Sequence, residues 1–233
     1  MGAHTVTSFD EDLAEIDGLV REMVDLAASM VGEATHSLIA SDKALAQRVV
    51  SDDAVMDTLQ RKLDDRAITL IGRRQPMAQD LRAVIGAIRM AGDLERIGDL
   101  AKNIDKRVGS VRQSAMPREL GHSIEDMAGP VLEQVRGVIA EYDARSPEGL
   151  VRVRDEDELI DVKYIAVFRE LLTYMMEDPR NITDCTHLLF CAKNLERIGD
   201  HVTNIAENAY YMLTGEQLPA HRPKQDETGT PAA

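Results

Sequence analysis

The 233-residue chain is poor in aromatic residues, with no Trp, three Phe and five Tyr. Proteins that bind single-stranded nucleic acid stack the bases on aromatic side chains, which this chain can hardly supply. Positive charge is also in deficit, because 27 Lys and Arg residues stand against 41 Asp and Glu residues and leave a net charge of −14. Since Lys and Arg bind the phosphate backbone, we expect no nucleic-acid partner.

Cysteines and long apolar runs are scarce as well. Cys185 and Cys191 do not form a CxxC pattern, so the sequence predicts neither a disulfide scaffold nor a zinc ribbon. No apolar run approaches the roughly 18 residues needed to span a bilayer, and residues 1–10 show no secretory signal. We therefore expect a cytoplasmic protein that reaches a membrane only through its partners.

What the sequence has in abundance is helical periodicity. Apolar residues recur every three or four positions along most of the chain, which predicts an all-α fold. Ser8 and Glu11 have the spacing of a capping box, and Pro76 and Pro147 suit the first turn of later helices. The expected helices span residues 9–40, 42–72, 76–112, 117–143, 147–177 and 181–214.

A sequence repeat divides these six helices into two halves. Residues 91–104 read AGDLERIGDLAKNI and residues 192–205 read AKNLERIGDHVTNI, with nine of fourteen positions identical. Each copy falls on the third helix of its half. The repeat predicts two tandem three-helix bundles related by internal duplication, at 1–114 and 115–215. Residues 216–233 are polar and rich in proline, and we expect them to form a disordered tail.

The repeat places acidic residues on one face of each third helix. Residues four positions apart share a helix face. If neighbouring helices pack side by side, their acidic stripes would meet, with Val55, Leu59 and Leu63 turned away toward the core. The stripes consist of acidic pairs with this spacing, namely Asp53 with Asp57, Glu95 with Asp99, Asp157 with Asp161, and Glu196 with Asp200.

Carboxylates gathered in this way would offer hard oxygen ligands to Mg, Mn, Fe or Ca. The alternative is a solvated helix face, in which Arg96 and Arg197 offset the acids. Cation binding would explain why the motif occurs in both halves. It would also explain Gly98 and Gly199, since a mid-helix glycine costs roughly 0.5–1 kcal/mol relative to alanine, although close helix packing would account for the glycines equally well.

Histidine suggests a competing metal site of the ferritin-like di-iron type. Glu33 with His36 and Glu119 with His122 have its Glu-x-x-His spacing. The two pairs do not occupy equivalent positions in the duplication, however, so solvated or capping histidines remain the alternative. Signatures of common enzyme classes, such as GxxxxGK[ST], GxSxG and HExxH, are absent from the sequence, and we expect a binding or regulatory protein rather than an enzyme.

The repeated motif also carries a family resemblance. The doubled LERIGD, each followed by an Asn (Asn103 and Asn204), together with RRQPMA at 73–78 and LTYMMED at 172–178, closely resembles the PhoU family of bacterial phosphate-signalling regulators. The resemblance runs from about residue 4 to residue 215. The two copies differ where Asp93 is matched by Asn194 and where Leu100 is matched by His201.

The resemblance implies a cytoplasmic homodimer of two three-helix bundles that negatively regulates phosphate uptake and the phosphate regulon. Its implied partners are a PhoR-type sensor histidine kinase and PstB, the ATPase of the Pst phosphate transporter. It also implies metal binding through E(D)xxxD motifs, with divalent or ferric ions such as Fe, Mn, Mg or Zn. Position by position, the implied metal ligands are the eight acidic residues given above. A metal-independent helical adaptor is the main alternative function.

Overall fold

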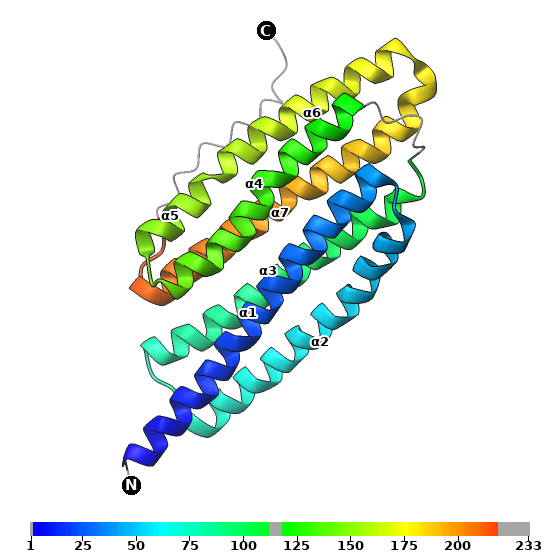
Figure 1. Ribbon diagram of the computed structural model, residues 1–233. Helices are drawn as coiled ribbons and strands as arrows, with labels where there is room; N and C mark the ends of the chain where they lie inside the picture. The colour runs from blue at the N-terminus through cyan, green and yellow to red at the C-terminus, as the bar shows by residue number, and fades with distance from the viewer. Residues whose placement is uncertain (1, 112–117, 219–233) are drawn as a thin grey trace.

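The structure is a computed structural model that describes residues 2–111 and 118–218. Within these ranges the fold is all-α and contains no strand, as the periodicity predicts (Figure 1). The first half consists of α1 (Gly2–Ala40), α2 (Lys43–Arg74) and α3 (Gln79–Val108). The second half consists of α4 (Arg118–Asp143), α5 (Pro147–Asp155), α6 (Asp157–Glu177), the 3₁₀ turn η2 (Pro179–Asn181) and α7 (Ile182–Thr214).

The helices form two bundles that lie side by side (Figure 1). In the first, α1, α2 and α3 pack on one another, and in the second, α7 packs on α4, α5 and α6. The units meet mainly where α3 contacts α7 and α1 contacts α4. The two copies of the repeat therefore lie against each other in the centre. The expected boundary at 114/115 and most of the expected tail lie outside the described residues.

Two helix starts differ from the sequence expectation. α1 begins at Gly2 and continues through Ser8. A serine at the N-cap stabilises a helix start by only about 1 kcal/mol, and no proline precedes Ser8 to interrupt the helix there. α3 begins at Gln79 instead of Pro76. The backbone of Gln75 and Ala78 adopts positive φ angles of 48° and 47°, so Pro76 lies in the α2–α3 turn, outside the helix.

The expected helix at 147–177 is divided at Glu156 into α5 and α6, although the two remain in line as one outer rod (Figure 1). Ser146 caps α5 by accepting a hydrogen bond from the Gly149 N–H at 3.0 Å. At the division the Leu159 N–H bonds to the Glu156 carbonyl three residues back, which tightens the backbone locally. Asp157, the first residue of α6, is only 1% exposed, and the irregularity accompanies the burial of its side chain.

The core runs continuously through both halves and is lined by the apolar faces of all the long helices. α2 buries Met56, Leu59 and Leu63, whereas Val55 is 47% exposed. The expectation that Val55 faces the core is therefore wrong, because the buried face of α2 is centred on Met56, one residue further along the helix. None of the described helices is long and apolar enough to cross a membrane.

Candidate functional site

The acidic stripes of α2 and α3 meet at the seam between these helices. Lys102 of α3 demonstrates their proximity, because its Nζ lies 2.6 Å from Asp53 Oδ2 on α2 and 2.6 Å from Asp99 Oδ1 on α3. Both contacts are hydrogen bonds donated by the ammonium group. The first acidic face, defined here as Asp53, Asp57, Glu95 and Asp99, thus combines residues from two helices, as the sequence predicted.

Electrostatic coupling extends across the whole first acidic face. Burial raises the pKa of Glu95 above its ordinary value, and the negative charges of Asp99, Asp57 and Asp53 raise it further. The hydrogen bond from Lys102 has the opposite effect and lowers the pKa of Asp99. Glu95 is therefore repelled by the other three carboxylates, and a cation between them would reduce this repulsion.

A second acidic face lies on the seam between α6 and α7 and is defined here as Asp161, Glu196 and Asp200. Burial raises the pKa of Glu196, and the charges of Asp200 and Asp161 raise it further, while a hydrogen bond from Lys193 lowers it. Lys193 Nζ lies 2.7 Å from Glu196 Oε1 and 5.1 Å from the centroid of the Tyr164 ring. The three carboxylates are therefore close enough to influence one another.

Asp157, the remaining acidic residue of the predicted set, is not on the surface of the second half. Its side chain is buried against Gly199 of α7. A Cβ atom at Gly199 would be 2.5 Å from Asp157 Oδ1, so only glycine at this position leaves room for the carboxylate. A Cβ atom at the equivalent Gly98 would instead meet Met56 and Met30, at ordinary van der Waals distances. Asp157 is thus buried, whereas the other three predicted ligands of its half are partly exposed.

The two faces differ in how well they would accommodate a metal ion. Among the described residues, no three His, Cys, Asp or Glu side chains are already arranged as a metal site. In the first acidic face an ammonium group lies between two of the carboxylates. In the second, Glu196 Oε2 is buried and accepts no hydrogen bond, so it is an acceptor that suits a cation. The oxygen donors of both faces fit Mg, Mn or Fe better than a metal that prefers thiolates.

The histidine pairs do not form a di-iron site. Glu33 Oε1 accepts a hydrogen bond from Arg48 at 2.6 Å, and His36 is exposed. The side chain of His122 is 79% exposed and lies 3.7 Å from Glu125. Both histidines therefore lie at the surface, in line with the alternative left open by the unequal positions of the two pairs in the repeat.

The differences between the two copies of the repeat have a structural role that the sequence did not reveal. His201 Nδ1 of α7 lies 2.9 Å from Asp93 Oδ1 of α3, and Asn204 donates a hydrogen bond of 3.3 Å to the same oxygen. Asp93 and His201 are two of the positions at which the copies diverge. They join the two repeats, so the divergence serves the interface between the halves.

Sequence reasoning also missed Lys102 and Lys193, the two lysines that pair with the acidic faces. Each has a signal in the sequence, because Lys102 follows Asp99 by three positions and Lys193 precedes Glu196 by three, a spacing that allows contact on a helix. The contact of Lys102 with Asp53 has no such signal, since it depends on how α2 packs against α3.

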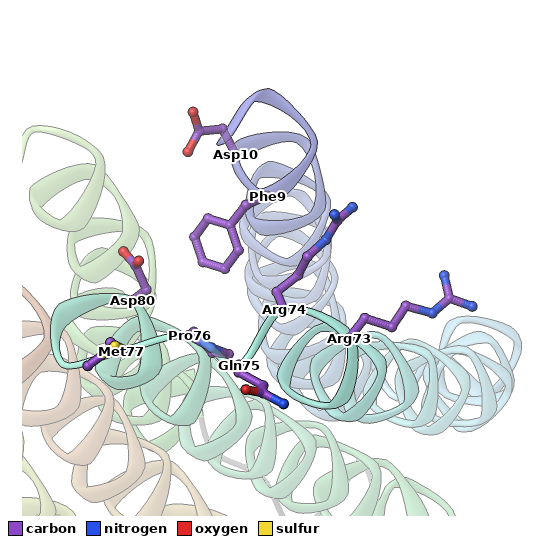
Figure 2. Close-up of a pocket in the computed structure, with 8 residues that line it drawn as sticks. All are labelled: Phe9, Asp10, Arg73, Arg74, Gln75, Pro76, Met77 and Asp80. Atoms are coloured by element: carbon purple, nitrogen blue, oxygen red, sulfur yellow. The ribbon is translucent and has the colours of Figure 1, made fainter. Parts of the chain in front are cut away.

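A separate pocket lies at the α2–α3 turn, away from both acidic faces. It encloses about 440 Å³ between the start of α1 and the turn, and Figure 2 shows the Phe9 ring directed toward Pro76 and Asp80. Arg74, whose side chain points away from the pocket in this view, pairs with Asp12 at 3.4 Å. The pocket is lined by two arginines and two aspartates, so it shows no strong preference for a charged ligand.

Comparison with known proteins agrees with this architecture. The family model described as the PhoU domain matches twice, at residues 20–108 and 124–209. A phosphate-specific transport system accessory protein PhoU homolog from Rhizobium meliloti is 54% identical over 228 residues, covering 98% of this chain and 96% of that protein. The homolog of the same description from Caulobacter vibrioides is 46% identical, covering 97% of this chain and 98% of that protein.

Two solved structures share the fold. The crystal structure of PhoU from Pseudomonas aeruginosa superposes with a TM-score of 0.85 at 31% sequence identity, covering 89% of this chain and 100% of that chain. The phosphate transport system regulatory protein PhoU from Streptococcus pneumoniae superposes with a TM-score of 0.83 at 26% identity, covering 91% and 99%. The likeness therefore extends through both halves of the molecule.

Proposed function

The chain belongs to the PhoU family of phosphate transport accessory proteins, and we therefore propose that it is a negative regulator of phosphate uptake and of the phosphate regulon. In this proposal it links a Pst-type phosphate transporter, through the PstB-type ATPase, to a PhoR-type sensor histidine kinase. It acts in the cytoplasm, as a homodimer, without catalytic activity of its own. The names of its relatives, an accessory protein of the phosphate-specific transport system and a regulatory protein, support this role.

The observation that carries the proposal is the presence of an acidic face at the same place in each half. The first face lies on the seam between α2 and α3, and the second on the seam between α6 and α7. A surface of this charge suits a partner that presents basic residues, because complementary charges raise the rate and the specificity of association. Two such faces on one chain would allow it to contact two partners, the transporter ATPase and the kinase.

Metal ions complete the proposed docking surface. We assign divalent or ferric ions, such as Fe, Mn, Mg or Zn, to the acidic faces. The candidate ligands are Asp53, Asp57, Glu95 and Asp99 in the first half, and Asp161, Glu196 and Asp200 in the second, with Asp157 buried at the start of α6. A bound ion would supply positive charge between the carboxylates, and the chain's own residues would position it.

Signalling then follows from unequal binding. A regulator can shift the activity of the kinase only if it binds two states of the transporter or of the kinase with different affinity. We propose that the acidic faces bind preferentially to one transporter state and thereby report phosphate supply to the kinase. Phosphate itself need not bind, because the negative charge of the faces disfavours an anion.

The test is a pull-down of purified transporter ATPase and sensor kinase, with and without a chelator. The same experiment is run with Glu196→Gln/Asp200→Asn, and with Glu207→Gln as a control at an exposed position of α7. We expect binding by the wild type and by the control, and weaker binding by the double variant and after chelation. Failure of the wild type to bind either partner would refute the proposed link between transporter and kinase.

A metal-independent adaptor is the second candidate, and one observation favours it. The faces already carry the ammonium groups of Lys102 and Lys193, which neutralise part of their charge. This candidate predicts partner binding that weakens with salt, because exposed charge pairs are screened, but survives chelation. The chelation arm of the pull-down thus separates the two candidates.

A further inference from the structure

The first acidic face contains a cation that belongs to the chain. The ammonium of Lys102 lies 2.6 Å from both Asp53 Oδ2 and Asp99 Oδ1, one on each side of the seam. The lysine side chain is only 18% exposed, and that of Asp53 only 15%. The ammonium therefore already supplies positive charge between two carboxylates, one from each helix.

The second acidic face is organised differently. The residue that corresponds to Lys102 in the repeat is Thr203, which is buried and carries no charge. Lys193 approaches this face instead, but it contacts Glu196 on its own helix and is 46% exposed. Lys193 is more exposed than Lys102 and pairs with a carboxylate of its own helix only, so it can turn away into solvent more easily than Lys102 can.

We propose that Lys102 closes the first acidic face to metal ions, so that metal binding in this chain is confined to the second acidic face. The proposal rests on the metal-binding part of the proposed function and assigns it to one of the two faces. The two halves, despite the shared motif, have then divided their roles. In the first half the Lys102 ammonium neutralises part of the acidic face, and in the second half a metal ion from solution does so.

Two physical features support this division. A metal ion at the first face would have to displace an ammonium that is held by two carboxylates from two helices, and would leave that charge partly buried without its partners. At the second face, Glu196 Oε2 is already buried without a hydrogen bond. The free-energy cost of dehydrating this oxygen therefore belongs to folding and does not oppose ion binding. An incoming ion at the second face therefore meets a carboxylate oxygen that accepts no hydrogen bond, whereas at the first face it would have to displace the Lys102 ammonium.

The test measures binding of Mn²⁺ alone, from the fall in the free-ion EPR signal during titration, in four proteins and one control variant. These are the wild type, Lys102→Met, Glu196→Gln/Asp200→Asn, and the variant that combines all three substitutions. Lys106→Met in the background of the double variant is the matched control, because Lys106 is an exposed lysine one turn further along α3. Circular dichroism confirms that each variant keeps its helical content.

We expect the wild type to bind Mn²⁺, the double variant to lose at least tenfold in affinity, and Lys102→Met to restore binding in the double variant. The Lys106→Met control should restore nothing. Mn²⁺ should also raise the melting temperature of the combined variant, a readout that does not depend on signalling activity.

Four results would overturn the proposal in whole or in part. If the double variant kept wild-type affinity, the first face would bind metal despite its lysine. If Lys102→Met restored no binding in the double variant, the lysine would not be what closes this face. If the wild type bound no Mn²⁺ but Lys102→Met did, the role of Lys102 would stand and metal binding at the second face would fail. If none of the four proteins bound Mn²⁺, the role of Lys102 and metal binding at the second face would both be refuted.

Discussion

Replacing Asp105 with asparagine is expected to stabilise the protein at neutral and alkaline pH. Asp105 of α3 is 3% exposed and accepts a hydrogen bond from the Ser37 hydroxyl of α1. Its second oxygen, Oδ2, is buried without a hydrogen bond. Burial, with a smaller contribution from the charge of Glu33, raises the pKa of Asp105 from 3.8 to about 7.

The magnitude follows from this pKa. In the unfolded chain Asp105 ionises near pH 3.8, whereas in the folded protein it holds its proton until about pH 7. The folded state thus binds more protons between these values, and stability falls as the pH rises through this window. At about 1.4 kcal/mol per pKa unit, the full penalty is ~4 kcal/mol, reached near pH 7 and absent below pH 4.

Asparagine removes the charge and keeps the shape. Its carbonyl oxygen can accept the Ser37 hydrogen bond, and its neutral amide group removes the charge repulsion from Glu33. We therefore expect Asp105→Asn to gain roughly 2–4 kcal/mol at pH 8, which corresponds to a melting temperature higher by ~5–15 °C, and to change little at pH 4.

The assay is thermal and urea unfolding, followed by circular dichroism from pH 4 to pH 8. Asp25→Asn, at an exposed position of α1, is the control and should leave the pH profile unchanged. The reasoning would be refuted if Asp105→Asn had the same pH dependence as the wild type, or if it were less stable than the wild type at pH 8.

Three further substitutions test the packing described above by thermal unfolding. Gly199→Ala should destabilise the protein by about 1–3 kcal/mol, because the new methyl group would meet the Asp157 carboxylate and Ile160, the latter at 3.0 Å. Gly98→Ala should be neutral or stabilising by up to ~1 kcal/mol, since its neighbours leave room and alanine favours the helix; equal effects at the two glycines would contradict the structural difference between the halves. Ser146→Ala should cost about 1 kcal/mol through the loss of the α5 cap, and an unchanged melting temperature would show that this cap contributes nothing.

The sequence by itself determined the helical fold, the two halves and the composition of the first acidic face. Each of these depends on the direction in which a side chain leaves its helix, which residue spacing sets directly. The spacing of Glu95 and Asp99 places them on one face whatever the rest of the molecule does. The same reasoning misplaced Val55, because the boundary of a buried face depends on the helix that covers it.

The tertiary structure decided which groups from different helices meet. The pairing of Lys102 with Asp53, the contact of His201 with Asp93 and the burial of Asp157 against Gly199 all join segments far apart in the chain. Their distances depend on the register and spacing of packed helices, which periodicity does not contain. Two halves that carry one motif therefore acquired different surroundings, because each copy of the motif is completed by side chains that lie outside it.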